Sequence, residues 1–135
     1  MRLYIIGFMV GVIGLVAANQ VRAEEDCGLR SEGVFKVAGW HTEKTQLDLT
    51  LISIDLVSMD AKTISEVSGS VEFMAGGDSI FSLPITLRKP AEPGVRFPLE
   101  YLARDRNTAK RLAGAHAIAC VASMTYADGS GVIIN

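Results

Sequence analysis

Apolar and polar residues alternate with a period of two along two neighbouring segments, Val67 to Phe73 and Phe81 to Leu87. This is the period of a β-strand that buries one face, because successive side chains point to opposite sides of the strand. The residues between the segments include Gly76-Gly77, which predicts a turn and therefore a β-hairpin. Pro84 cannot donate a hydrogen bond to a neighbouring strand, so we expect it on an unpaired sheet edge.

Five further segments have the apolar patterns and flanking turn residues of strands. They are Val34 to His41, Thr45 to Val57, Val95 to Tyr101, Ala117 to Tyr126 and Val132 to Ile134. Ala117 to Tyr126 is apolar on both faces, which predicts a central strand, and the Asp128-Gly129 turn connects it to the last strand.

The segment Thr45 to Val57 changes phase in its middle. Its apolar residues occupy odd positions up to Leu51 and even positions from Ile52 onward. A slip of one residue would turn the apolar set to the wrong face unless a bulge absorbs it. We therefore predict a bulge or bend near Leu51-Ile52, with a strand buried on both sides as the alternative.

Residues 105–114 interrupt the strand pattern and predict one or two turns of helix that cross between sheets. Asn107 or Thr108 can cap the start of this helix, and Gly114 can take the left-handed conformation that ends it. Seven short strands without the spacing of β-α-β units predict an all-β fold, an antiparallel sandwich. A small β-barrel is the alternative.

The run Thr63 to Arg88 and the late "YADGSG", Tyr126 to Gly131, resemble FxLYD-like and immunoglobulin-like β-sandwich domains of bacterial envelope proteins of unknown function. The resemblance implies an immunoglobulin-like sandwich that serves as an interaction or structural module, and it implies no active site. The Cys-Trp-Cys core of antibody domains is missing, because Cys27 precedes the first predicted strand and Trp40 comes early.

The N-terminus has the plan of a cleaved secretory signal peptide over residues 1–23. Arg2 precedes the apolar run Leu3 to Ala18, and Val21-Arg22-Ala23 is a cleavage site of small or slim side chains. An uncleaved anchor is the alternative, but the apolar run is shorter than the ~20 residues that cross a bilayer. We expect a periplasmic or secreted protein whose single domain covers residues 24–135. Three acidic residues precede Cys27, which excludes lipidation at a first mature cysteine.

The chain contains two cysteines, Cys27 and Cys120. In an oxidising compartment we expect them to form one disulfide, which could contribute ~4 kcal/mol by restricting the unfolded chain. A free redox pair is the alternative, although no Cys-x-x-Cys motif is present.

The charge balance argues against a nucleic-acid partner. Cleavage after Ala23 removes Arg2 and Arg22 but no acidic residue, so the formal net charge changes from −2 to −4. Nucleic-acid binding usually requires a strongly basic face. After cleavage no apolar segment remains for stable membrane insertion.

Catalytic and metal-ligating motifs are not recognisable. The two histidines, His41 and His116, are far apart in the sequence, and neither accompanies a nucleophile motif. We find no spacing typical of zinc, calcium or phosphate sites, so we expect no catalytic residues, no metal and no cofactor.

Two features are possible interaction sites. Trp40 is a residue type enriched in binding hot spots, although the single Trp of a small sandwich more often belongs to the core. A basic segment, which we define as Arg104, Arg106, Lys110 and Arg111, is the main local concentration of positive charge. It predicts either a solvated helix face or a docking patch for an acidic partner.

We therefore expect a non-catalytic exported β-sandwich protein that acts through contacts with a protein partner in the envelope. The alternative is a small disulfide-bonded inhibitor of a secreted enzyme. Such an inhibitor needs an exposed loop that enters a cleft, and Lys89 to Phe97 is the best candidate.

Overall fold

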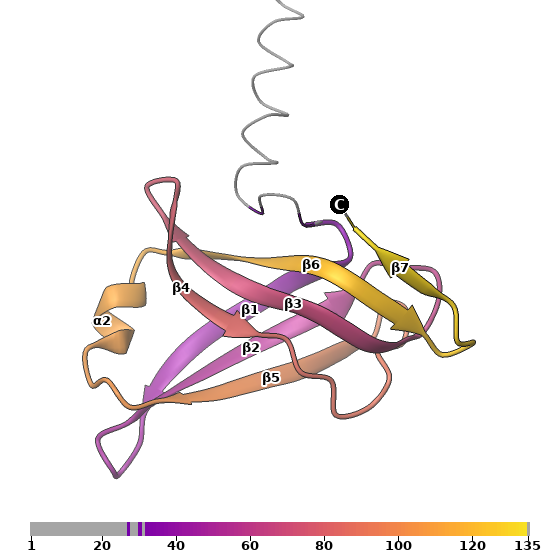
Figure 1. Cartoon of the computed structure of the whole chain (residues 1–135). Coiled ribbons are helices and arrows are strands. Elements are labelled where there is room, and N and C mark those ends of the chain that lie inside the picture. Colours follow the sequence, from indigo (N-terminus) through magenta and orange to yellow (C-terminus); the bar gives the residue numbers. More distant parts are fainter. Residues whose placement is uncertain (1–26, 28–29, 31, 135) are drawn as a thin grey trace, which may run out of the picture.

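The computed structural model describes residues 27, 30 and 32–134 of the chain (Figure 1). The predicted signal peptide, residues 1–23, lies outside the described residues. The elements in chain order are β1 (Phe35–Lys44), β2 (Thr50–Ser58), β3 (Ile64–Ala75), β4 (Asp78–Pro84), β5 (Arg96–Ala103), α2 (Thr108–Leu112), β6 (His116–Tyr126) and β7 (Gly131–Ile133).

The strands form two antiparallel sheets that face each other as a sandwich. One sheet has three strands in the order β1-β2-β5, and the other has four in the order β4-β3-β6-β7. Each sheet ends in two edge strands, so the predicted sandwich is confirmed and the alternative of a small barrel is wrong. β6 is a central strand, as predicted.

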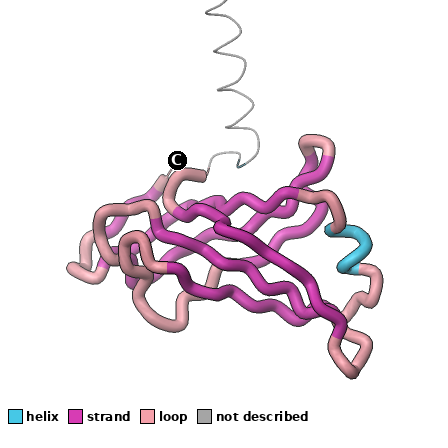
Figure 2. Tube along the Cα trace, turned by 180° about the vertical axis from the view of Figure 1, so that it is seen from behind, coloured by secondary structure: helices cyan, strands magenta, loops and turns pink. Residues whose placement is uncertain are grey.

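The short helix α2 connects the two sheets at one end of the sandwich (Figures 1 and 2). It follows β5 of the three-stranded sheet and precedes β6 of the four-stranded sheet, which confirms the predicted crossover. Asn107 is the N-cap residue but makes no side-chain cap hydrogen bond. Instead, the Thr108 hydroxyl donates to the Asp105 carbonyl at 2.8 Å. Gly114 has φ +81°, the left-handed conformation predicted for the helix end.

The hydrophobic core lies between the sheets and follows from the period-two patterns. Ile52, Ile54 and Leu56 of β2 point inward, as do Val71 and Phe73 of β3, and all five are fully buried. Burying each of these side chains contributes about 1.5–3 kcal/mol, so the facing strands β2 and β3 supply much of the driving force for folding.

The predicted bulge near Leu51-Ile52 is wrong. β2 begins only at Thr50 and pairs with β5 without a register shift. The leucines that precede it belong to a turn, in which Asp48 has φ 64° and Leu47 is 79% exposed. The phase change therefore marks the start of the strand. The bulge in this sheet lies in β1, between Val37 and Gly39.

The predicted β3-β4 hairpin is present, with different strand ends. β3 begins already at Ile64, and β4 ends at Pro84 instead of continuing to Leu87. Both turn glycines have positive φ, 62° for Gly76 and 86° for Gly77, which glycine adopts without steric cost. β4 is an edge strand, as the position of Pro84 predicted.

Candidate functional site

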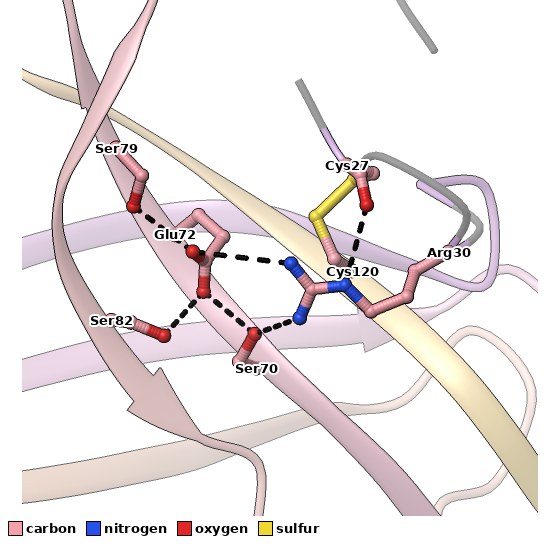
Figure 3. The surroundings of a disulfide bond; sticks show 7 residues. All are labelled: Cys27, Arg30, Ser70, Glu72, Ser79, Ser82 and Cys120. Atoms are coloured by element: carbon pink, nitrogen blue, oxygen red, sulfur yellow. Dashed lines mark hydrogen bonds and ion pairs between the residues drawn. A yellow bond between two sulfur atoms is a disulfide. The ribbon is translucent and has the colours of Figure 1, made fainter. Parts of the chain in front are cut away.

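A disulfide between Cys27 and Cys120 holds the N-terminal segment against the four-stranded sheet, as predicted (Figure 3). The Cα atoms of the two cysteines are 5.5 Å apart, and the pair closes a loop with a sequence separation of 93. Cys120 pairs with Ser70 of β3, whose side chain belongs to the face turned away from the core. Both cysteines are buried together with Met74 and Ile118 in a second, smaller apolar cluster.

Glu72 of β3 lies beside the disulfide and is only 7% exposed, although it points away from the sandwich core. Its carboxylate accepts hydrogen bonds from the hydroxyls of Ser70 at 2.6 Å, Ser79 at 2.9 Å, and Ser82. The guanidinium of Arg30 reaches across from the N-terminal segment to within 4.0 Å of the same carboxylate (Figure 3). We call these five residues the Glu72 cluster.

Arg30 connects the cluster to the disulfide. It donates one hydrogen bond to the Ser70 hydroxyl at 2.6 Å and another to the carbonyl of Cys27 at 3.3 Å. Burial raises the pKa of Glu72, but the hydrogen bonds from Ser70, Ser82 and Ser79 outweigh it, and the pKa falls below its ordinary value. A carboxylate with a lowered pKa is a weak base. The cluster therefore fastens the N-terminal segment, and its chemistry does not favour activation of a serine.

A cleft of about 500 Å³ opens between β4 and β5, which are edge strands of opposite sheets. We call it the β4–β5 cleft. Two of the residues that line it belong to the core, Leu83 at 2% exposed and Leu99 at 8% exposed, so the cleft reaches the interior. Phe97 and Tyr101 of β5 add aromatic surface, and the Tyr101 ring packs edge-on against Phe81 with ring centroids 6.3 Å apart.

The opening of the β4–β5 cleft carries two prolines and a mixed set of charges. Pro84 lies on β4 and Pro98 on β5, and both line the cleft. Arg88 and Lys89 follow β4 at the rim, where they are exposed, and the lining includes one carboxylate, Glu100. Of the residues that line the cleft, only Lys89 and Phe97 belong to a site predicted from the sequence, the candidate inhibitor loop.

The loop Lys89 to Phe97, predicted as the candidate inhibitor loop, contributes its two end residues to the lining of the cleft. Ala91 exchanges two backbone hydrogen bonds with Ile64, at 2.8 and 2.9 Å, and Gly94 donates one to the Ser58 carbonyl at 3.0 Å. Between and beyond these anchors residues 92–96 are exposed, whereas Phe97, which already belongs to β5, is half-buried against the core. The loop is thus an exposed segment with fixed attachment points.

Trp40 is half-buried and packs against the core. Its ring contacts Phe73 edge-on, with centroids 4.9 Å apart, so it joins the two sheets across the sandwich. This packing explains the position of Trp40 by a structural role in the core.

The basic segment is exposed at all four of its cationic residues. Arg106 forms an ion pair with Asp48 at 3.7 Å, and Arg111 forms one with Asp105 at 3.8 Å. Arg104 and Lys110 form no ion pair with any residue that the structure describes. Neighbouring carboxylates therefore offset about half of the positive charge that the sequence suggests.

The two histidines belong to different sheets, His41 to β1 and His116 to the start of β6. His41 is exposed and lies 3.8 Å from Glu43 of the same strand. Within residues 27, 30 and 32–134, no group of three or more His, Cys, Asp or Glu side chains has the arrangement of a metal site. No helix in this part of the chain is long and apolar enough to cross a bilayer.

Comparisons of the chain with protein-family models, with curated proteins and with solved structures give no match.

Proposed function

We propose that the chain is an exported, non-catalytic β-sandwich protein that acts by binding another protein of the envelope. The disulfide supports export, because such bonds form and persist in oxidising compartments such as the periplasm or the extracellular medium. The carboxylate of Glu72 lies beside three serine hydroxyls but is a weak base, because its pKa is lowered, and the two histidines belong to different sheets; both observations support a binding role over catalysis.

The observation that carries the proposal is the anchored, exposed loop Lys89 to Phe97. Its backbone is tied to β3 through Ala91 and to the end of β2 through Gly94. A segment that is already ordered loses little conformational entropy when a partner binds it. Exposed Val95 beside the anchors supplies apolar surface that a partner can cover.

A second candidate function is inhibition of a secreted enzyme, and the same loop favours it. An inhibitory loop benefits from the same rigidity, because it enters a cleft without first having to be ordered. The identity of the partner protein distinguishes the inhibitor from the binding module. A hydrolase as the sole partner supports the inhibitor, whereas a component of an envelope assembly supports the module.

We also propose that the sandwich is immunoglobulin-like. In constant-type immunoglobulin domains the first, second and fifth strands share one sheet, and the third, sixth and seventh share the other. The orders β1-β2-β5 and β3-β6-β7 fit this partition, whereas β4 pairs with β3 instead of joining the first sheet. This strand partition supports the resemblance that the sequence suggests.

Photo-cross-linking in envelope extract tests the binding role. A photoreactive residue replaces Glu92 of the exposed loop, and a matched variant carries it at Glu43 on β1. We expect a protein adduct at position 92 and not at position 43, and its mass identifies a hydrolase or an assembly component. No adduct, or identical adducts at both positions, would contradict binding through this loop.

A further inference from the structure

The β4–β5 cleft has the size and depth of a small-molecule site. Its volume of about 500 Å³ falls within the ~300–1,000 Å³ typical of ligand pockets. Leu83 and Leu99 line it from the core, and Phe97, which is partly buried and packs against the same core, lines it as well. An apolar group that enters the cleft would therefore leave water and contact core side chains.

The two strands beside the cleft disfavour an extended peptide as its occupant. A peptide that adds to a sheet edge needs a continuous row of backbone donors and acceptors. Pro98 on β5 and Pro84 on β4 each lack a backbone N–H, and prolines at edges are a device against strand addition. Recognition in the cleft thus depends on packing and charge.

The charges at the opening favour an anionic head group. Arg88 and Lys89 are exposed at the rim and form no ion pair with the described residues, whereas Glu100 is the one acidic residue among those that line the cleft. The formal charge of the lining is therefore positive, in a protein whose net charge is −2. Two adjacent cations attract a carboxylate most strongly where the wall behind it is apolar and excludes water.

We propose that the β4–β5 cleft binds a medium-chain fatty acid, with the acyl chain between Leu83, Phe97 and Leu99 and the carboxylate at Arg88 and Lys89. The apolar depth accommodates the chain, and the cationic rim holds the head group in water. This proposal is independent of the protein-binding role, because it requires no partner.

Titration of the purified, delipidated protein with dodecanoate, kept below its micelle concentration, tests the proposal. Calorimetry should give saturable binding of one dodecanoate per chain. Arg88→Glu combined with Lys89→Glu should weaken this binding about tenfold, as expected for lost charge-assisted hydrogen bonds. The matched control, Lys36→Glu with Lys44→Glu on β1, should bind dodecanoate like the wild type.

Two further measurements separate the head group from the acyl chain. Dodecanol, which has no charge, should bind the Arg88→Glu/Lys89→Glu variant and the wild type equally. Thr86→Trp places a large side chain at the exposed lining and should abolish binding of both ligands. Thermal melting of each variant shows that the fold is intact.

The proposal is overturned if dodecanoate does not saturate, if charge reversal leaves its affinity unchanged, or if Thr86→Trp binds both ligands normally. Tenfold tighter binding of a lysophospholipid than of dodecanoate would overturn the assignment of a carboxylate head group. Since no partner protein is present, each of these results leaves the cross-linking test at Glu92 unaffected.

Discussion

The guanidinium of Arg30 lies 4.0 Å from the carboxylate of Glu72 and shares the hydroxyl of Ser70 with it. This relationship joins two segments that are about forty residues apart in sequence, the N-terminal segment and the outer face of β3. Together with the disulfide at Cys27, this ion pair holds Cys27 and Arg30 over the outer face of the four-stranded sheet, which would otherwise be exposed to water (Figure 3).

Removal of the disulfide should destabilise the protein. In Cys27→Ala/Cys120→Ala the free energy of unfolding should fall by about 2–5 kcal/mol, as is typical when a small secreted domain loses a native disulfide. Urea denaturation of the variant and of the wild type measures the difference. Because the variant has no thiols, its transition should not move when a reductant is added, whereas that of the wild type should. Equal midpoints for both proteins would show that the disulfide is energetically neutral.

Glu72 should make stability depend on pH in the acid range. Its pKa is lowered in the folded state, so the carboxylate contributes stability at pH values above its ordinary pKa of 4.5. That stability is lost as the pH falls through 4.5 and toward the lower folded pKa, because the unfolded state then binds more protons than the folded state. Denaturation between pH 7 and pH 3 should show a smaller loss for Glu72→Gln than for the wild type.

Glu66→Gln is the matched control for this experiment. Glu66 lies on the same strand, and it forms no hydrogen bond or ion pair with the side chains that the structure describes. Its pH profile should follow that of the wild type. Parallel profiles for wild type and Glu72→Gln would show that the Glu72 cluster does not stabilise the charged carboxylate.

Gly69→Ala should be strongly destabilising because of the close approach of β3 to β6. A Cβ at this position would clash with the carbonyl oxygen of Cys120 and lie 3.0 Å from the Cα of Val121, both backbone atoms. We expect a loss of about 1–3 kcal/mol, the usual cost of overpacking. Gly39→Ala is the control, because a Cβ there meets nothing within 4 Å. A thermal melt of Gly69→Ala that matches Gly39→Ala would contradict this reading of the contact.

Charge reversal in the basic segment should affect binding and not folding. Arg104→Glu with Lys110→Glu changes the two cations that have no ion pair with described residues, so thermal stability should change by less than about 0.5 kcal/mol. If this segment attracts an acidic partner protein, the variant should associate with that partner much more slowly than the wild type at low salt. Added salt should reduce the difference in association rate between variant and wild type. An unchanged association rate at low salt, with the fold of the variant intact, would show that the segment is only a solvated connector between β5 and β6.

If the chain is exported as we propose, the mature protein should begin at Glu24 and carry no lipid, because the Val21-Arg22-Ala23 site precedes it. Intact-mass measurement of the protein from the periplasm or medium tests this. A mass that includes residues before Ala23, or a diacylglycerol on Cys27, would contradict it.

Local sequence was sufficient to predict the strands whose pattern is buried on one side. The alternation in Val67 to Phe73 and the glycines of the following turn were enough to predict the hairpin. With a period of two and one apolar face, only one assignment of the residues to the two faces of the strand buries the apolar side chains. The pattern misled at Leu47, where an apolar residue of a turn was counted as part of β2. An exposed apolar side chain carries no signal in a sequence that distinguishes it from a buried one.

What the sequence by itself determined is therefore the strand alternation, the helical crossover and the disulfide, whose pairing was predictable because only two cysteines exist. Only the tertiary structure decided which polar side chains are buried and where apolar surface is accessible. Glu72 reads as an outward-facing polar residue, yet the cover formed by Cys27 and Arg30 buries it. The β4–β5 cleft likewise exists because edge strands of two different sheets border each other. Both features depend on contacts between residues far apart in the chain, and periodicity within a segment carries no information about such contacts.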